Sequence, residues 1–268
     1  MNFLSFKPPA NSHPRQNHLL AALPDGEWTR CLVHLELVEF PVGRVLCESD
    51  SAAEFVYFPT TAIISLMSIT VEGGTSEVAI VGNEGVVGIC AITGGRSMPI
   101  QTIVQSAGQG YRLRSTLFKT ELERAGTLLH LLLRYTQSLI TQIAQSAACN
   151  RHHNIEQQLS RRLLLALDRS PSEDLAITQE RLACLLGVRR EGITAAALKL
   201  QQAGVIRYQR GHISVLDREG LERRTCECYA AVAKENKRLL PAALSARRLL
   251  PMPIAEPMQI AEPMPIAA

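Results

Sequence analysis

The chain has 268 residues, of which 46% are hydrophobic and 20% charged, a balance typical of one large or two ordinary globular domains. No segment of about 18 residues is both apolar and uncharged, and no apolar leader lies at the N-terminus, so we expect a cytoplasmic protein without membrane spans. The net charge of +3 is uneven, because residues 31–110 carry two basic and eight acidic side chains and residues 181–210 carry six basic and one acidic. This asymmetry predicts an acidic module joined to one that binds polyanions.

The first half of the chain is predicted to be a β-domain behind a short helical entry. Residues 1–15 are rich in proline and polar residues, which predicts a disordered tail. Two short helices are expected over 19–23 and 25–35, the second with Asp25 as its N-cap. Residues 38–114 then contain short runs of Val, Ile, Phe and Tyr, separated by Gly, Pro, Asn or Asp at roughly 8–12 residue spacing. This spacing predicts an antiparallel sandwich or barrel.

A long helix is predicted after Arg114, because residues 115–150 contain no proline and Gly126 is their single glycine. One apolar stripe recurs at i+3 and i+4, and its members are Leu128, Leu132, Tyr135, Leu139, Ile143 and Ala147. Neighbouring leucines widen the stripe, so we expect the helix to be buried on more than one side. It is either a core helix of a monomer or the contact between two subunits, and a DNA-binding unit downstream favours the second.

The last third of the chain shows local signals for helix ends and turns. A capping box at residues 154–157 begins a helix that ends before Pro171, and Thr178 caps a short helix that stops at Gly187. Residues 204–217 predict two strands joined by a turn at 210–211, after which Asp217 caps a last helix through Val232. From Pro251 the chain repeats Ile-Ala-Glu-Pro-Met, and its frequent prolines predict a disordered tail.

The order helix, glycine turn, helix and β-hairpin is that of a winged helix-turn-helix. Gly187 suits a turn position with positive φ, and the small Ala183 allows the two helices to pack at a steep angle. Ile193 and Ala197 are expected to face the first helix across a shared core. The start of the second helix is then left exposed, and it carries Arg189, Arg190, Glu191 and Thr194. In this motif that end of the helix enters the major groove of DNA.

Arginine and glutamate side by side match the chemistry of base recognition. Arginine binds guanine through O6 and N7, and glutamate accepts a hydrogen bond from cytosine N4. Two cations at a helix N-terminus oppose the helix dipole, a cost that DNA phosphates would offset. The alternative is a solvated helix surface, the usual role of such a triplet in isolation. For Lys199, Arg207, Arg210 and His212, phosphate contacts and ordinary surface positions are both open.

With these motifs the chain resembles the Crp/Fnr family of bacterial transcription regulators over residues 16–225. The likeness is carried by "EFVYFPTTAIISLM", "EVAIVGNEGVVG" and the Arg190-Glu191 pair. The family implies an α+β fold with a cupin-like β-roll of the cyclic-nucleotide-binding type, a long dimerisation helix and a winged helix-turn-helix. We therefore expect six segments: a tail (1–15), a β-roll sensor domain (16–118), the dimerisation helix (119–150), the DNA-binding domain (151–225), a helical extension (226–250) and a Pro-rich tail (251–268).

The resemblance also implies a function. A regulator of this type is not an enzyme; it binds a palindromic operator in double-stranded DNA as a homodimer through residues 119–150, and RNA polymerase is a further candidate partner. By the same likeness Arg190 and Glu191 are the base-recognising pair. Family members often carry another polar reader five residues after that arginine, where this chain has Ala195. The operator sequence is therefore not transferred from the family.

The family's known effector sites do not carry over. Cyclic-nucleotide binders place a Gly-Glu pair on the ribose, but here Val86 follows Gly85, and an Arg96-Ser97 pair lies out of register by two residues. We therefore expect no cyclic AMP binding, and Cys31 and Cys47 do not form the cysteine cluster of an iron–sulfur relative. A haem version stays open, because a single ligand leaves no spacing signature.

No metal site and no cofactor are expected. The seven cysteines are irregularly spaced, which favours free thiols in a reducing compartment, and Cys226 and Cys228 on a helix would point to different sides. Two other classes were weighed against the regulator: a cupin-like metalloenzyme, which needs clustered histidines that the β-domain lacks, and a scaffold that has lost DNA binding.

Overall fold

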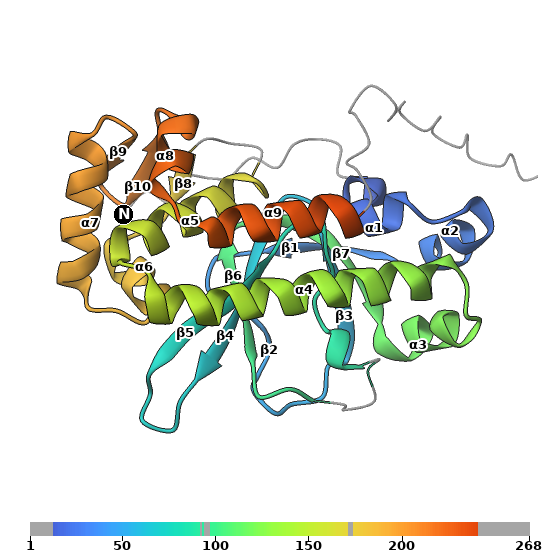
Figure 1. Ribbon diagram of the computed structural model, residues 1–268. Helices are drawn as coiled ribbons and strands as arrows, with labels where there is room; N and C mark the ends of the chain where they lie inside the picture. Colours follow the sequence, from blue (N-terminus) through green and yellow to red (C-terminus); the bar gives the residue numbers. More distant parts are fainter. Residues whose placement is uncertain (1–12, 92, 94–96, 171–173, 241–268) are drawn as a thin grey trace, which may run out of the picture.

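The computed structural model describes residues 13–91, 93, 97–170 and 174–240, and its N-terminal half is the predicted antiparallel β-roll (Figure 1). One sheet has three strands in the order β1-β7-β3, which span Glu36–Phe40, Gly108–Arg114 and Phe55–Pro59. The other has four strands in the order β2-β6-β4-β5, which span Val45–Cys47, Gln101–Ser106, Ile63–Ile69 and Thr75–Val81. All neighbouring strands in both sheets are antiparallel. The 3₁₀ turn η2 (Ile89–Ala91) lies between β5 and β6.

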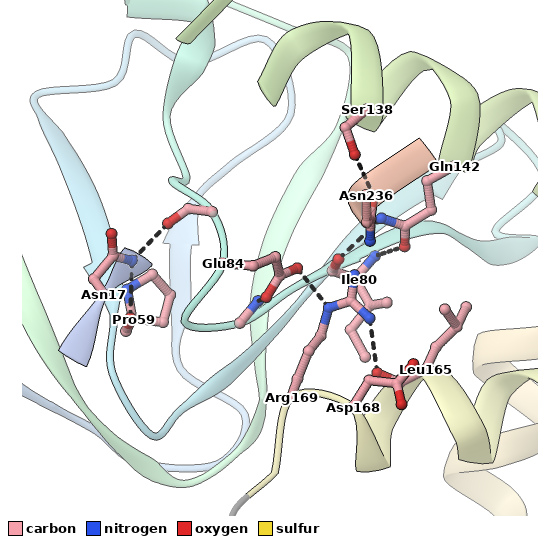
Figure 2. Close-up of polar contacts among 12 residues, drawn as sticks. Asn17, Pro59, Ile80, Glu84, Ser138, Gln142, Leu165, Asp168, Arg169 and Asn236 are labelled. Carbon is pink, nitrogen blue, oxygen red and sulfur yellow. Dashed lines mark hydrogen bonds and ion pairs between the residues drawn. The ribbon is translucent and has the colours of Figure 1, made fainter. Parts of the chain in front are cut away.

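The N-terminal entry differs from the expectation in two details. Residues 13–15 of the predicted tail are ordered, because the 3₁₀ turn η1 (Pro14–Gln16) buries its proline; residues 1–12 lie outside the described part of the chain. Two short helices follow as expected, α1 (His18–Ala21) and α2 (Asp25–Leu32). Asp25 is the first residue of α2 and not its cap, since Pro24 holds the cap position. Asn17 caps α1 and also donates hydrogen bonds to the carbonyls of Pro59 and Gly85 (Figure 2).

The predicted long helix is two helices, α3 (Ser115–Glu123) and α4 (Thr127–His152). The chain turns between them at Ala125, whose φ of 52° is left-handed, and Gly126 is the N-cap of α4. Both carboxylate oxygens of Glu27 accept hydrogen bonds from the free backbone N–H groups of Thr127 and Leu128, at 2.8 and 2.9 Å. An acidic side chain from α2 therefore caps the long helix, and its negative charge interacts favourably with the positive end of the helix dipole.

Helix α4 has three different sides. Leu128, Leu132, Tyr135 and Leu139 of the predicted stripe are buried in the core of the chain's own β-roll, beside α1 and β5. A second side packs along α9 (Glu227–Leu239), which lies beside α4 in Figure 1. The third side faces solvent. Ala147, which the periodicity placed in the buried stripe, is exposed on this side.

The C-terminal half is the predicted winged helix-turn-helix. Helix α5 (Ile155–Leu167) begins at the expected capping box, in which Asn154 and Gln157 exchange hydrogen bonds. The later elements are α6 (Gln179–Leu186), α7 (Arg190–Gln202), β9 (Ile206–Gln209), β10 (His212–Val215) and α8 (Arg218–Arg224). A strand that the sequence did not indicate, β8 (Asp174–Ala176), completes the wing sheet in the order β8-β10-β9.

The expected last helix from Asp217 to Val232 is interrupted. Asp217 caps α8 as predicted, but the chain is extended at Thr225 and Cys226 before α9 begins. The predicted Pro-rich tail, residues 251–268, lies outside the described residues, as do residues 241–250. No helix within the part of the chain described here is long and apolar enough to cross a membrane.

The four-stranded sheet is covered by apolar side chains on both faces, which joins the two halves of the molecule. Ile64 and Leu66 of β4 point into the β-roll core, whereas Ile63 and Met67 of the same strand belong to the core of the helix-turn-helix unit. This alternation follows from the two-residue period of a strand. The winged helix is therefore docked on the outer face of the β-roll and shares a core with it.

Candidate nucleic-acid interface

The turn between α6 and α7 has the geometry that the sequence predicts. Thr178 caps α6 by accepting a hydrogen bond from the backbone N–H of Arg181, and Gly187 ends the helix at φ 64°, ψ 33°. A side chain with a Cβ is strained at this left-handed φ, so glycine suits the position. Leu182, Ile193 and Ala197 are buried in a shared core, as expected.

The N-terminus of α7 presents its charged side chains to solvent. Arg189 is the N-cap, and Arg190 and Glu191 are the first two helical residues; all three are exposed. Within the described residues none of the three forms an ion pair, although fifteen pairs are found elsewhere. The two cations thus lie at the positive end of the helix dipole and have no ion-pair partner in the part of the chain that the structure describes, which suits them to bind an external anion.

Thr194 is exposed as predicted, but its hydroxyl is already engaged. Its Oγ1 lies 2.7 Å from Oε1 of Gln179 and 3.1 Å from the backbone carbonyl of Arg190. The hydroxyl proton is therefore used inside the protein, where it ties the first residue of α6 to α7. Only the acceptor side of Thr194 remains for a ligand.

One residue of this surface was missed from sequence. Leu198 lies seven residues after Glu191 and is 53% exposed. At 100° per residue the two share a line along α7 with Ala195 and Gln202, on the side opposite the buried Ile193. An apolar side chain there can contact the methyl group of thymine. The i, i+4, i+7 spacing was a usable signal, but a leucine in an amphipathic helix is ordinarily assigned to the core.

A second group of basic residues lies at the wing and at the far end of α7. The hairpin turn has positive φ at both central residues, 50° at Arg210 and 82° at Gly211, as a two-residue turn with right-handed strand twist requires. Arg210 and His212 are exposed there, and Lys199 is exposed in the last turn of α7. None of them has an ion-pair partner within the described residues.

Not every cation of the basic region is available to a polyanion. Arg181 is half-buried against the β-roll, where its Nε donates to Oε1 of Gln105 at 2.9 Å and its Nη2 to the carbonyl of Val104 at 3.0 Å. Arg181 belongs to the basic region of the sequence, but its hydrogen bonds hold α6 against the four-stranded sheet.

Buried ion pairs reinforce this docking. Arg162 of α5 pairs with Glu77 of β5, and Nε of Arg169 lies 2.6 Å from Oε1 of Glu84 in the loop after β5. Figure 2 shows the second pair and, beside it, Gln142 of α4 on the backbone of Ile80. The side chains of Arg162 and Arg169 are almost fully buried. Buried charges require such partners, so these acids of the β-roll hold the winged helix in one orientation.

The loop that carries Glu84 also borders a small apolar cavity between the β-roll and α4. Its volume is about 30 Å³, room for little more than water, and its lining includes Cys47, Leu66, Val86, Cys90, Met98 and Leu139. None of the lining residues is charged. Val86 is part of this lining, whereas Glu84, two residues earlier in the chain, points away to Arg169. Arg96 lies outside the described residues.

Comparisons with known proteins agree with this geometry. Residues 157–224 match the Crp-like helix-turn-helix domain. A structure assigned to the crp/fnr family from Eubacterium rectale has a TM-score of 0.59 at 14% identity and covers 76% of this chain and 96% of its own. FixK2 from Bradyrhizobium japonicum has a TM-score of 0.58 at 15% identity, covering 72% and 98%.

A third structure, the c-di-GMP-responsive global regulator CLP from Xanthomonas campestris, has a TM-score of 0.57 at 16% identity and covers 72% of this chain and 99% of its own. No curated protein sequence matches the chain. The structural matches show the fold, and the domain match includes the exposed N-terminus of α7. The chain therefore contains a Crp-like helix-turn-helix domain at residues 157–224, within a fold similar to those of solved regulators of the Crp/Fnr type.

Proposed function

We propose that the chain binds a palindromic operator as a homodimer, with the N-terminus of α7 of each subunit in a major groove. The observation that carries this proposal is the exposed Arg189-Arg190-Glu191 sequence at the start of α7, whose cations have no counter-charge within the described residues. Ordinary surface arginines elsewhere in the chain, such as Arg223 and Arg238, have acidic neighbours within 4 Å.

In this arrangement the side chains have different tasks. Arg190 recognises guanine through O6 and N7, and Glu191, at the centre of the exposed side of α7, accepts from cytosine N4. Arg189, Lys199, Arg210 and His212 contact phosphates, which sets the register of the protein on the duplex. Thr194 accepts from the DNA while its proton holds Gln179 in place.

The two-fold contact is proposed for the solvent side of α4. This side carries Leu133 and Ile140, 59% and 61% exposed, in line with the exposed Ala144 and Ala147. Leu132 and Leu139 of the predicted apolar stripe do not form this contact, because they are only 3% and 6% exposed and belong to the subunit's own core. A second copy is the partner that fits, because successive half-sites lie about 34 Å apart on one side of DNA and require two linked winged helices.

The test is selection of binding sites from a random duplex pool by the full chain and by Arg190→Ala and Glu191→Ala. Arg190→Ala should weaken binding to the selected operator by about 1–3 kcal/mol per half-site and spare non-specific binding. Glu191→Ala should relax the preference at one base pair and leave non-specific affinity equal or higher, because a charge that repels phosphates is gone.

Two controls separate recognition from general charge. Lys199→Ala should weaken binding to all sequences alike and reduce the salt slope by about one unit. Lys237→Ala removes a cation that is also exposed, on α9 and away from the proposed surface, and should change neither affinity nor sequence preference. If Arg190→Ala selects the same operator with the same affinity, the arginine is an ordinary surface residue and the proposal is wrong.

A further inference from the structure

Three cysteines and a histidine from two distant parts of the chain meet at the junction of α4 and α9. Cys149 and His153 lie at the C-terminal end of α4, and Cys226 and Cys228 lie at the start of α9. Their four possible ligand atoms all lie within 4.8 Å of one another. The three cysteines are buried, and His153 is partly exposed at the edge of the cluster.

The sequence predicted no metal site here, because Cys226 and Cys228, separated by one residue, would point to different sides of a helix. The structure removes that objection, because Cys226 is not helical. It is the N-cap of α9 with φ −96° and ψ 169°, and only Cys228 lies in the first turn. The bend in the chain between them brings both thiols to the same side, toward the end of α4.

Two of the distances within the cluster match the edges of a tetrahedral zinc site, and the remaining ones are no longer than 4.8 Å. With Zn–S bonds of about 2.3 Å and Zn–N bonds of about 2.0–2.1 Å, tetrahedral geometry places two sulfurs about 3.8 Å apart and a sulfur and a nitrogen about 3.6 Å apart. Here the sulfurs of Cys149 and Cys226 are 3.6 Å apart, and the Cys228 sulfur is 3.7 Å from Nδ1 of His153. The ligands therefore need little movement to close on an ion.

The surroundings also suit a metal. Nε2 of His153 lies 3.3 Å from Oε1 of Glu227, a carboxylate that would hold the ring with Nδ1 toward the cluster, as carboxylates do behind zinc-bound histidines. Three thiolates and Zn²⁺ carry a net charge of −1, and the buried guanidinium of Arg161 lies close enough to favour it.

We propose that Cys149, His153, Cys226 and Cys228 bind one Zn²⁺ ion in a closed tetrahedral Cys₃His site. Four protein ligands leave no open position, so the role of the ion is structural and not catalytic. In the sequence, Cys149 and His153 precede the helix-turn-helix unit, residues 154–225, and Cys226 and Cys228 follow it. The ion therefore fastens both ends of the DNA-binding unit to the end of α4, and its binding free energy stabilises the docked arrangement.

The site is tested on the full chain, purified with reductant and equilibrated with a zinc buffer before the metal content is measured by mass spectrometry. We expect about one zinc per chain, and replacement by Co²⁺ should produce the intense visible absorption and thiolate charge-transfer bands of a tetrahedral thiolate site. Cys149→Ala and His153→Gln should each lose both signals. His153 is partly exposed, so its variant tests the site even if Cys149→Ala fails to fold.

Cys90→Ala is the matched control, because Cys90 is a buried cysteine of the β-roll, outside the cluster, and its loss should leave the metal content unchanged. Glu227→Gln should retain the ion but weaken its affinity about tenfold or more, through the looser histidine. The proposal is overturned if the unmutated chain holds no stoichiometric zinc, if His153→Gln binds it as well, or if the reduced preparation contains a Cys149–Cys226 disulfide. None of these measurements involves DNA, so they stand apart from the test of the proposed function.

Discussion

Two neighbouring pairs of residues on α4 distinguish the proposed dimer contact from the core of the subunit. Leu133 and Ile140 are 59% and 61% exposed, whereas Leu132 and Leu139, one residue earlier in each case, are 3% and 6% exposed. One residue turns a helix by 100°, so each pair samples a different side of the same helix. The perturbation is the double variant Leu133→Ala, Ile140→Ala.

The expected effect follows from the surface that these side chains still expose. Complete burial of a Leu or Ile is worth about 1.5–3 kcal/mol, and about three fifths of each remains to be covered, or about 0.9–1.8 kcal/mol per side chain. A two-fold interface contains four of them, so the double variant should weaken dimerisation by about 4–7 kcal/mol. This corresponds to a roughly 10³- to 10⁵-fold increase in the dissociation constant. Folding of the single subunit should hardly change.

Sedimentation over a concentration series measures this constant, and urea unfolding measures the subunit's stability. Leu132→Ala, Leu139→Ala is the matched control: each substitution leaves a core cavity and should lower the free energy of unfolding by about 2–5 kcal/mol, with little effect on the dimer that remains folded. If the exposed pair can be truncated without any change in sedimentation, or if the unmutated chain is a monomer at micromolar concentration, the dimer face lies elsewhere.

Three further outcomes are expected. Glu84→Ala leaves the buried Arg169 without its ion-pair partner and should lower the free energy of unfolding, measured by urea titration, by about 3–5 kcal/mol. The control Glu54→Ala breaks an exposed pair with Arg114 and should lower it by less than about 1 kcal/mol. Equal effects of the two variants would contradict a docked winged helix. Calorimetry should show no micromolar binding of cyclic AMP, because Val86 supplies no ribose contact and the apolar cavity beside it has no charged side chain in its lining. A chain shortened before Pro251 should keep the melting temperature and DNA affinity of the full chain, and a fall of several degrees would disprove the prediction that the tail is dispensable.

Features that depend on residues close in the chain could be predicted. Each helix cap at Asn154, Thr178 and Asp217 is a side chain that binds a backbone N–H three residues later. The left-handed turn at Gly187 and the hairpin turn at 210–211 likewise depend on adjacent residues. From these short-range signals the winged helix-turn-helix and the exposed start of α7 follow directly, because a recognition helix is defined by its position after the turn.

Contacts between residues far apart in the sequence could not be predicted, because they depend on how the elements pack together. Periodicity showed that α4 is apolar on several sides, but which leucines face the β-roll depends on where the β-roll and α9 pack. The sequence places Arg181 in the basic region, but in the fold its side chain binds Gln105 of the four-stranded sheet and is not part of the basic surface. Cys149 and Cys226 are 77 residues apart, and their meeting requires the break before α9. Residues close in the chain determine where a helix or strand begins and ends. Which side of it stays exposed for a partner is determined by the elements that pack against its other sides.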